Sequence, residues 1–152
     1  MHSLQVGDHV PNFSGTDDNG KIHHLNDYKG KKLILFFFPK ANTPGCINEV
    51  CNLRDNYTVL NEAGYSLLGV SADTIAKQNK FATKFNLPFP LIADEQKSII
   101  NLFGVWGPKN FMGNDYEGIY RTTFIIDGQG VVERVYSKVK TKEHATQILE
   151  EV

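Results

Sequence analysis

The sequence predicts an α/β fold in which helices flank a mixed central sheet, and three patterns indicate it. Leu33–Phe38 is an unbroken apolar run between two lysines and Pro39, as expected of a central strand covered on both faces. After Pro44, apolar residues recur every three or four positions, which is the period of a helix with one buried face. Further on, residues 127–130 read Asp-Gly-Gln-Gly between two apolar runs and predict a hairpin turn.

The first half of the chain is expected to supply an N-terminal hairpin, a strand and a long helix. Residues 8–21 are rich in glycine and aspartate, which favours turns and short hairpin strands. Thr43 and Pro44 suit the N-cap and the first position of a helix. We expect this helix to run until Ala63-Gly64, where glycine is the stop signal.

The next segments alternate between strand and helix signals. Tyr65–Val70 reads as a strand, and Asp73 as the cap of a helix over Thr74–Phe85. Leu91–Ile92 is expected to form a short strand, and Glu95–Phe103 a short helix.

The last third carries the predicted hairpin and a final helix. Gly104–Tyr120 is rich in glycine and is expected to be a long loop. Thr122–Ile126 and Val131–Tyr136 are the predicted hairpin strands, and Thr141–Glu150 is the final helix. This order of elements is that of a thioredoxin-like fold with an added N-terminal hairpin, and we expect one such domain over residues 1–152.

The composition is that of an ordinary soluble protein, with 41% hydrophobic and 22% charged residues. A formal net charge of −1 gives no reason to expect a nucleic acid or an acidic lipid surface as partner. Residues 1–7 lack the basic and apolar regions of a secretory signal, and no window is apolar enough to span a membrane. We therefore expect a cytoplasmic protein.

Cys46 and Cys51 are the only cysteines. In a reducing compartment such a pair is more often catalytic or redox-sensing than structural, although both could simply be small buried apolar residues. Cys46 follows a Pro/Gly turn in the predicted first turn of a helix, where the N–H groups and the helix dipole favour a thiolate. The Thr43 hydroxyl and the N–H groups of Gly45 and Cys46 can point into the same space.

A sulfenic acid formed at Cys46 would condense with a nearby thiol, and Cys51 is the one candidate. Residues five apart on an intact helix have Cα atoms roughly 8–9 Å apart. A disulfide needs less than about 7 Å. We therefore expect the helix to unwind locally if the two sulfurs are to meet. The alternative is that Cys51 is only a packed helix residue.

The segment from Phe38 to Cys51 closely resembles the peroxidatic segment of the peroxiredoxins of the Q, or bacterioferritin comigratory protein, subfamily. The family motif Pro-x-x-x-Thr-x-x-Cys is filled by Pro39, Thr43 and Cys46. Further segments resemble the family in the same order and cover nearly the whole chain. They are Gly7–Phe13, Leu25–Lys31, Leu68–Asp73, Gly104–Trp106 and Arg121–Asp127.

The resemblance implies a role for each site residue. Cys46 would be the peroxidatic nucleophile and Cys51 the resolving cysteine. Thr43 would donate a hydrogen bond to the peroxide, and Pro39 would shield the thiolate from water. Arg121 would stabilise the thiolate and the developing oxyanion.

Glu49 would orient the arginine under the same resemblance. Without the resemblance, Arg121 could be a solvated residue at a strand end, and Glu49 could only be favourable to the helix dipole. The chain departs from the usual subfamily pattern at Ile47 and at Ala41-Asn42. These departures concern local helix stability and substrate preference rather than the chemistry.

The function implied is a thiol peroxidase that reduces hydrogen peroxide and organic hydroperoxides. A thioredoxin or glutaredoxin-like protein would reduce the resulting disulfide, and no metal, haem or flavin is implied. A resolving cysteine in the same helix removes the need for a dimer, so we expect a monomer. The alternatives are a thioredoxin-like disulfide reductase, which usually has Cys-x-x-Cys, and a non-enzymatic redox sensor or holdase.

Other signals are set aside. Gly15–Lys21 has the spacing of a phosphate-binding loop but ends in Ile22 where a magnesium ligand would stand, so we interpret it as a turn. The five histidines show no metal-ligand spacing, and His23 and His24 are expected at the surface. Trp106 could line the substrate mouth or cap the core.

Overall fold

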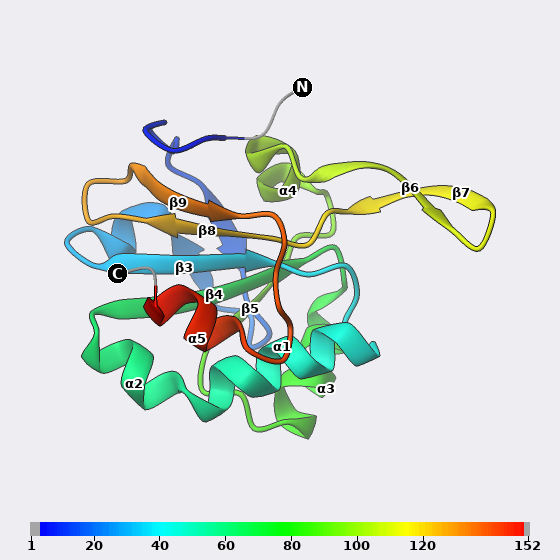
Figure 1. Ribbon diagram of the computed structural model, residues 1–152, viewed down its shortest axis with the longest axis horizontal. Coiled ribbons are helices and arrows are strands. Elements are labelled where there is room, and N and C mark those ends of the chain that lie inside the picture. Colours follow the sequence, from blue (N-terminus) through cyan, green and yellow to red (C-terminus); the bar gives the residue numbers. More distant parts are fainter. Residues whose placement is uncertain (1–3, 151–152) are drawn as a thin grey trace.

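The computed structural model describes residues 4–150, and its helices and strands form an α/β arrangement around a five-stranded sheet (Figure 1). The strands are β1 (Ser14–Thr16), β2 (Ile22–His24), β3 (Lys32–Phe37), β4 (Tyr65–Ser71), β5 (Leu91–Ala93), β6 (Trp106–Phe111), β7 (Asn114–Ile119), β8 (Thr122–Ile126) and β9 (Val132–Tyr136). The helices are η1 (Leu25–Tyr28), α1 (Pro44–Asp55), α2 (Tyr57–Glu62), α3 (Ile75–Lys84), α4 (Ser98–Phe103) and α5 (His144–Glu150). No helix in this range is long and apolar enough to cross a bilayer.

The central sheet has the strand order β5-β4-β3-β8-β9. β3 and β4 are parallel, as are β4 and β5, whereas β8 is antiparallel to both of its neighbours. The sheet is therefore mixed, and the predicted thioredoxin-like α/β class is confirmed. The N-terminal hairpin of β1 and β2 is confirmed as well.

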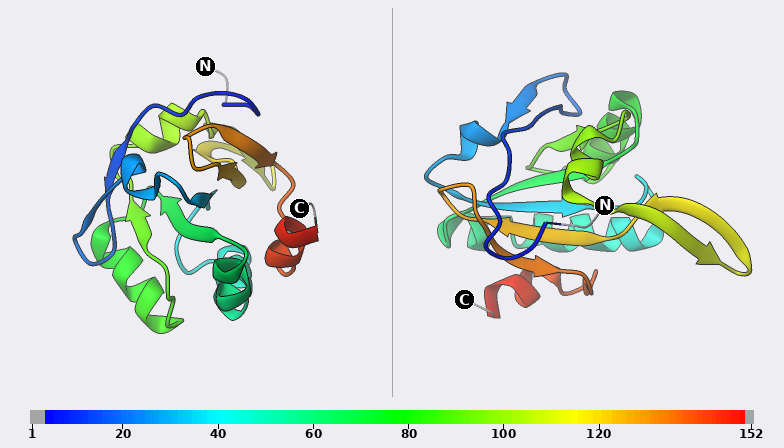
Figure 2. Two further views of the ribbon diagram at one scale, coloured as in Figure 1. Left: turned by 90° about the vertical axis from the view of Figure 1, so that its left-hand side faces the viewer. Right: turned by 90° about the horizontal axis from the view of Figure 1, so that it is seen from above.

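β3 lies at the centre of the sheet and divides the core into two clusters. Leu33, Leu35 and Phe37 face the N-terminal segment and α4. Ile34 and Phe36 face α1, α3 and α5 on the other side. Figure 2 shows these two groups of elements on opposite sides of the sheet. Because both faces of β3 are covered, its sequence is a continuous apolar run, as predicted.

The prediction of one continuous helix up to Ala63 is wrong in one respect, because the structure divides this helix at Asn56. The backbone of Asn56 has φ −109° and ψ 13°, and it separates α1 from α2. The Asn56 side chain donates to the carbonyl oxygen of Asn52 at 2.8 Å. An asparagine side chain that bonds the backbone in this way competes with helical hydrogen bonding.

Asp73 does not cap the next helix, contrary to the prediction. Thr74 does so, and its hydroxyl oxygen accepts from the N–H of Lys77 at 3.1 Å. The Asp73 carboxylate instead accepts from the N–H of Ala41 at 2.8 Å and from the hydroxyl of Ser71 at 2.7 Å. Asp73 therefore fastens the loop before α1 to the end of β4.

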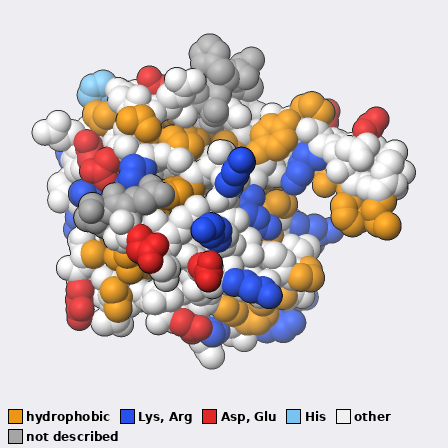
Figure 3. All heavy atoms as spheres, viewed as in Figure 1, with side chains coloured by type: hydrophobic (Ala, Val, Ile, Leu, Met, Phe, Trp, Pro, Cys, Tyr) orange, Lys and Arg blue, Asp and Glu red, His pale blue; other side chains and the backbone are white. Residues whose placement is uncertain are grey.

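The segment expected to be a long loop, Gly104–Tyr120, is mostly a second hairpin, and that prediction is wrong. β6 and β7 pair in register from Trp106–Ile119 to Phe111–Asn114. Met112 and Gly113 form the turn, both with positive φ, as two-residue hairpin turns require. The hairpin projects from the body (Figure 1), and hydrophobic side chains gather at its far end (Figure 3), where Phe111 and Met112 are exposed.

Gly69 in β4 is expected to tolerate no larger residue. A Cβ there would lie 2.7 Å from side-chain atoms of both Leu91 and Phe36. Overpacking of this kind costs about 1–3 kcal/mol. We expect Gly69→Ala to lower the free energy of unfolding by that amount in urea titrations. Ser66→Ala in the same strand is the control, and an equally small effect of both changes would contradict the packing argument.

Candidate active site

Cys46 is the third residue of α1 and is fully buried. Thr43 precedes the helix in an extended conformation, and its carbonyl accepts from the N–H of Ile47 at 2.8 Å. Thr43 is thus the N-cap by its backbone, as predicted. Its hydroxyl does not cap the helix, because it donates to the carbonyl of Lys40 at 2.8 Å.

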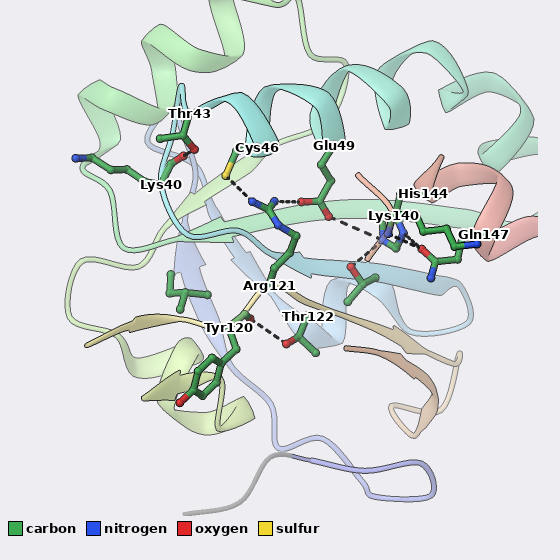
Figure 4. A network of polar contacts seen from close by, with 12 residues as sticks. Lys40, Thr43, Cys46, Glu49, Tyr120, Arg121, Thr122, Lys140, His144 and Gln147 are labelled. Carbon is green, nitrogen blue, oxygen red and sulfur yellow. Dashed lines mark hydrogen bonds and ion pairs between the residues drawn. The ribbon is translucent and has the colours of Figure 1, made fainter. Parts of the chain in front are cut away.

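Arg121 lies just before β8 and extends toward α1 (Figure 4). One guanidinium nitrogen, Nη2, donates to the Sγ atom of Cys46 at 3.4 Å. The other, Nη1, donates to Oε1 of Glu49 at 2.6 Å. The structure therefore brings together three of the residues predicted from the sequence, and the arginine lies between a sulfur and a carboxylate. Burial lowers the pKa of Arg121, but Glu49 and Cys46 raise it by more. The pKa of Arg121 therefore lies above its usual value, and the group stays charged.

Gly45 leaves the room that the guanidinium occupies. A Cβ at this position would lie 3.0 Å from Nη2 of Arg121. That distance is too short for an ordinary contact, so a larger residue would push the arginine away from the sulfur. The group nearest to Gly45 is therefore the Arg121 guanidinium.

Glu49 is fully buried, and only one of its two oxygens is hydrogen-bonded. Oε2 has no hydrogen-bond partner among the described residues. Burial raises the pKa of Glu49 to about 7, against the pull of the Arg121 guanidinium, which lowers it. Glu49 therefore accepts a hydrogen bond from Arg121 at a site where its negative charge is costly.

His144 is a site residue that the sequence did not single out. It lies on α5, fully buried, with Nε2 at 3.9 Å from Oε2 of Glu49. Its Nε2 is 2.8 Å from the hydroxyl of Thr123, and its Nδ1 is 3.0 Å from Oε1 of Gln147 (Figure 4). Burial lowers the pKa of His144 to about 4, so the ring is neutral near pH 7. Nothing local in the sequence indicates that this histidine faces Glu49.

A cavity of about 360 Å³ lies beside Pro39, between the loop before α1 and the β6–β7 hairpin. Its walls include Trp106, Tyr116 and Ile119, so Trp106 lines the cavity, and it also packs against the core. Lys109, another lining residue, donates to the carbonyl of Ile119 at 2.9 Å. Burial and the charge of Arg121 lower the pKa of Lys109. Lys109 was missed because its strand had been expected to be a loop.

Cys51 lies on the same helix as Cys46. It is partly buried and packs against the core cluster that contains Ile34 and Phe36. Neither cysteine is in a disulfide, and α1 is continuous between them. The structure therefore shows the dithiol form with the helix intact.

The expectation that His23 lies at the surface is wrong. It is buried, with Nε2 at 2.7 Å from the Asp17 carboxylate and Nδ1 at 3.0 Å from the Tyr28 hydroxyl. Asp17 also accepts from the N–H groups of Asn19 and Lys21, which closes a turn. The segment with phosphate-loop spacing is thus a turn, as predicted. His24 is exposed, and His2 lies outside the described residues.

The chain is similar in sequence to a known family and to named relatives. Residues 6–135 match the model of the AhpC/TSA family. Peroxiredoxin Bcp of Escherichia coli K12 is 43% identical over 149 residues, which cover 98% of this chain and 96% of that protein.

Solved structures agree with this. Peroxidoxin BcpB of Mycobacterium tuberculosis has a TM-score of 0.85 and 34% identity, covering 97% of this chain and 95% of the other. The bacterioferritin comigratory protein of Xanthomonas campestris has a TM-score of 0.89 and 28% identity, with coverage of 99% and 95%. Its structures were reported for its alkyl peroxide reduction activity.

The fold and the cysteine site are those of a thiol-dependent peroxidase. The chain belongs to the AhpC/TSA family and, within it, to the peroxiredoxins of the Bcp (PrxQ) type.

Glu49 and His144 are expected to give opposing pH dependences of stability. Glu49 stays protonated in the folded state up to about pH 7, against a reference pKa of 4.5. The raised pKa stabilises the folded state at low pH, and this contribution is lost as pH rises through 7. His144, with a pKa of about 4 against a reference of 6.5, contributes stability that is lost as pH falls through 4.

We therefore expect the Glu49→Gln variant to gain stability relative to wild type as pH rises from 4.5 to 7, by up to about 3 kcal/mol. The His144→Gln variant should gain stability relative to wild type as pH falls from 6.5 to 4, because glutamine takes up no proton in the unfolded state. Urea unfolding at several pH values measures both. A stability difference for Glu49→Gln that does not change with pH would contradict the assignment.

Proposed function

We propose that Cys46 is the nucleophile of this peroxidase, Cys51 its resolving residue, and Arg121 the group that stabilises charge at the reacting sulfur. The observation that carries this proposal is the guanidinium held between the Cys46 sulfur and the Glu49 carboxylate at the start of α1. A permanent cation with several donors is suited both to a thiolate and to an oxyanion. Glu49 then acts by positioning the arginine.

In the first step the Cys46 thiolate attacks one oxygen of the hydroperoxide ROOH. The S–O bond forms as the O–O bond breaks, the sulfur is oxidised to a sulfenic acid, and the other oxygen leaves as ROH after taking a proton. Charge develops on the departing oxygen, so donors fixed in advance lower the barrier. Arg121 and the N–H groups of the first helical turn are the donors near the sulfur. The Thr43 hydroxyl, which donates to the Lys40 carbonyl in the structure, would turn toward the bound peroxide to join them.

The substrates we propose are hydrogen peroxide and organic hydroperoxides. Alkyl peroxide reduction is the activity reported for the Xanthomonas campestris relative. The cavity beside Pro39 has apolar side chains among its walls, which suits the carbon chain of an organic hydroperoxide. Pro39 would limit the access of water to the thiolate.

In the second step the Cys51 sulfur attacks the oxidised Cys46 sulfur, a disulfide forms, and the oxygen leaves as water. Cys46 is buried and α1 is continuous, so this step requires α1 to unwind between the two residues. An external dithiol protein then reduces the disulfide and is itself oxidised. We propose thioredoxin or a glutaredoxin-like protein for this role.

One chain contains every group proposed for peroxide reduction and disulfide formation, so we propose that it works as a monomer. The cycle starts from free thiols, which are maintained in a reducing compartment. We therefore propose a cytoplasmic location.

Cysteine variants test the assignment. With thioredoxin, thioredoxin reductase and NADPH, we expect Cys46→Ser to consume no peroxide above background. Cys51→Ser should react once and stop as the sulfenic acid, detected by trapping with a dimedone-type reagent and mass spectrometry. Full turnover by Cys51→Ser would show that an outside thiol resolves the intermediate. Stoichiometric peroxide consumption by the wild type, with no turnover, would favour a sensor.

Unwinding of α1 should be visible by amide exchange. We expect residues 43–55 to lose protection in the disulfide form relative to the dithiol form, because the helical hydrogen bonds between the two cysteines must break. Strands β3 and β8 serve as internal references that keep their protection. Equal protection of residues 43–55 in the two forms would contradict the proposed movement.

A further inference from the structure

Asn52, in the last turn of α1, joins that helix to the start of α5. Its Nδ2 donates to the carbonyl of Lys142 at 2.9 Å, and its Oδ1 accepts from the N–H of Ala145 at 2.8 Å. The N–H groups in the first turn of a helix have no partner within that helix. Asn52 therefore caps α5 from a different helix, and both hydrogen-bonding ends of its amide are used.

The segment that receives these bonds is itself fixed. Oε1 of Gln147 accepts from the N–H of Lys140 at 3.1 Å, and its Nε2 donates to the carbonyl of Lys138 at 2.9 Å. The Gln147 side chain thus ties the segment before α5 to α5 itself. The two groups that bond Asn52 are held in place, so α1 is attached to a fixed anchor.

Asn52 directly follows Cys51 along the chain. Glu49, three residues earlier on the same face of α1, approaches His144 on the same anchor. Cys51 therefore lies between two residues that face residues 142–145. As long as the amide of Asn52 keeps both of its bonds, the backbone at Cys51 is held in the helix.

We propose that Asn52 is a positioning residue that sets the rate at which Cys51 reaches Cys46. The proposal rests on the proposed roles of the two cysteines. For the Cys51 sulfur to reach the oxidised Cys46 sulfur, α1 must unwind, and the two bonds of Asn52 break as it does. Asn52 takes no part in the attack of Cys46 on the peroxide.

This rate decides between two fates of the sulfenic acid. In one, Cys51 displaces the oxygen as water and a disulfide forms. In the other, a second hydroperoxide oxidises the sulfenic acid to the sulfinic acid and leaves as ROH. The second reaction depends on peroxide concentration and the first does not. Slow release of Asn52 therefore makes the enzyme more easily inactivated at high peroxide.

The test measures the two steps separately in the full-length protein. We expect Asn52→Ala to leave the rate constant of Cys46 with hydrogen peroxide unchanged. Disulfide formation, followed by quenched flow and thiol alkylation, should accelerate by about 5- to 30-fold, as expected for the loss of two hydrogen bonds. The sulfinic fraction at a given peroxide concentration should fall in parallel.

Asn48→Ala is the matched control. Asn48 is on the same helix between the two cysteines, and no hydrogen bond of its side chain is found within residues 4–150. Alanine is a better helix former than asparagine. Through helix propensity alone, each of the two substitutions would therefore slow the unwinding of α1. Acceleration in Asn52→Ala but not in Asn48→Ala therefore identifies the bonds to α5.

Asn52→Leu is the second variant, because leucine keeps the bulk of the side chain and removes both bonds. We expect it to accelerate disulfide formation as well. Disulfide formation at the wild-type rate or slower in the folded Asn52 variants would overturn the proposal. A wild type that forms no Cys46–Cys51 disulfide at all would instead overturn the proposed function, so the two failures are distinct.

Discussion

The site depends on the two contacts of the partly buried Arg121 guanidinium. It is a charge placed between a sulfur on one side and a carboxylate on the other, and each partner needs it. Without it, Glu49 would be a buried acid with no counter-ion, a costly arrangement. The absence of a side chain at Gly45 leaves room for this contact.

The parts of the fold that could be predicted from the sequence are those with a local signal. β3 is covered on both faces and therefore has an unbroken apolar run, and α1 begins where Thr43 and Pro44 indicate. The β6–β7 hairpin was not predicted, because much of it faces solvent and its turn uses Met112, which rarely adopts a positive φ. Strands without a buried face do not show the alternation that identifies a strand.

The candidate site divides in the same way. The motif around Cys46 is continuous in the sequence, and Arg121 was found by resemblance to a family. His144 and Asn52 were not found, because their roles come from the packing of α5 against α1. Asn52 is next to Cys51 in the sequence, but nothing in the residues around it or around His144 indicates a contact between the two helices. Such contacts between distant segments become visible only in three dimensions.

The division of the core by β3 has a consequence for the oxidised protein. Cys46 belongs to the cluster that faces α1, α3 and α5, whereas the cluster beneath α4 and the N-terminal segment contains no residue of α1. When α1 loosens, the apolar contacts on one side of the sheet are disturbed and those on the other side are not. Local opening with a lower free energy than global unfolding is thereby possible. The cluster beneath α4 can thus stay packed while the cluster around α1 rearranges in the proposed cycle.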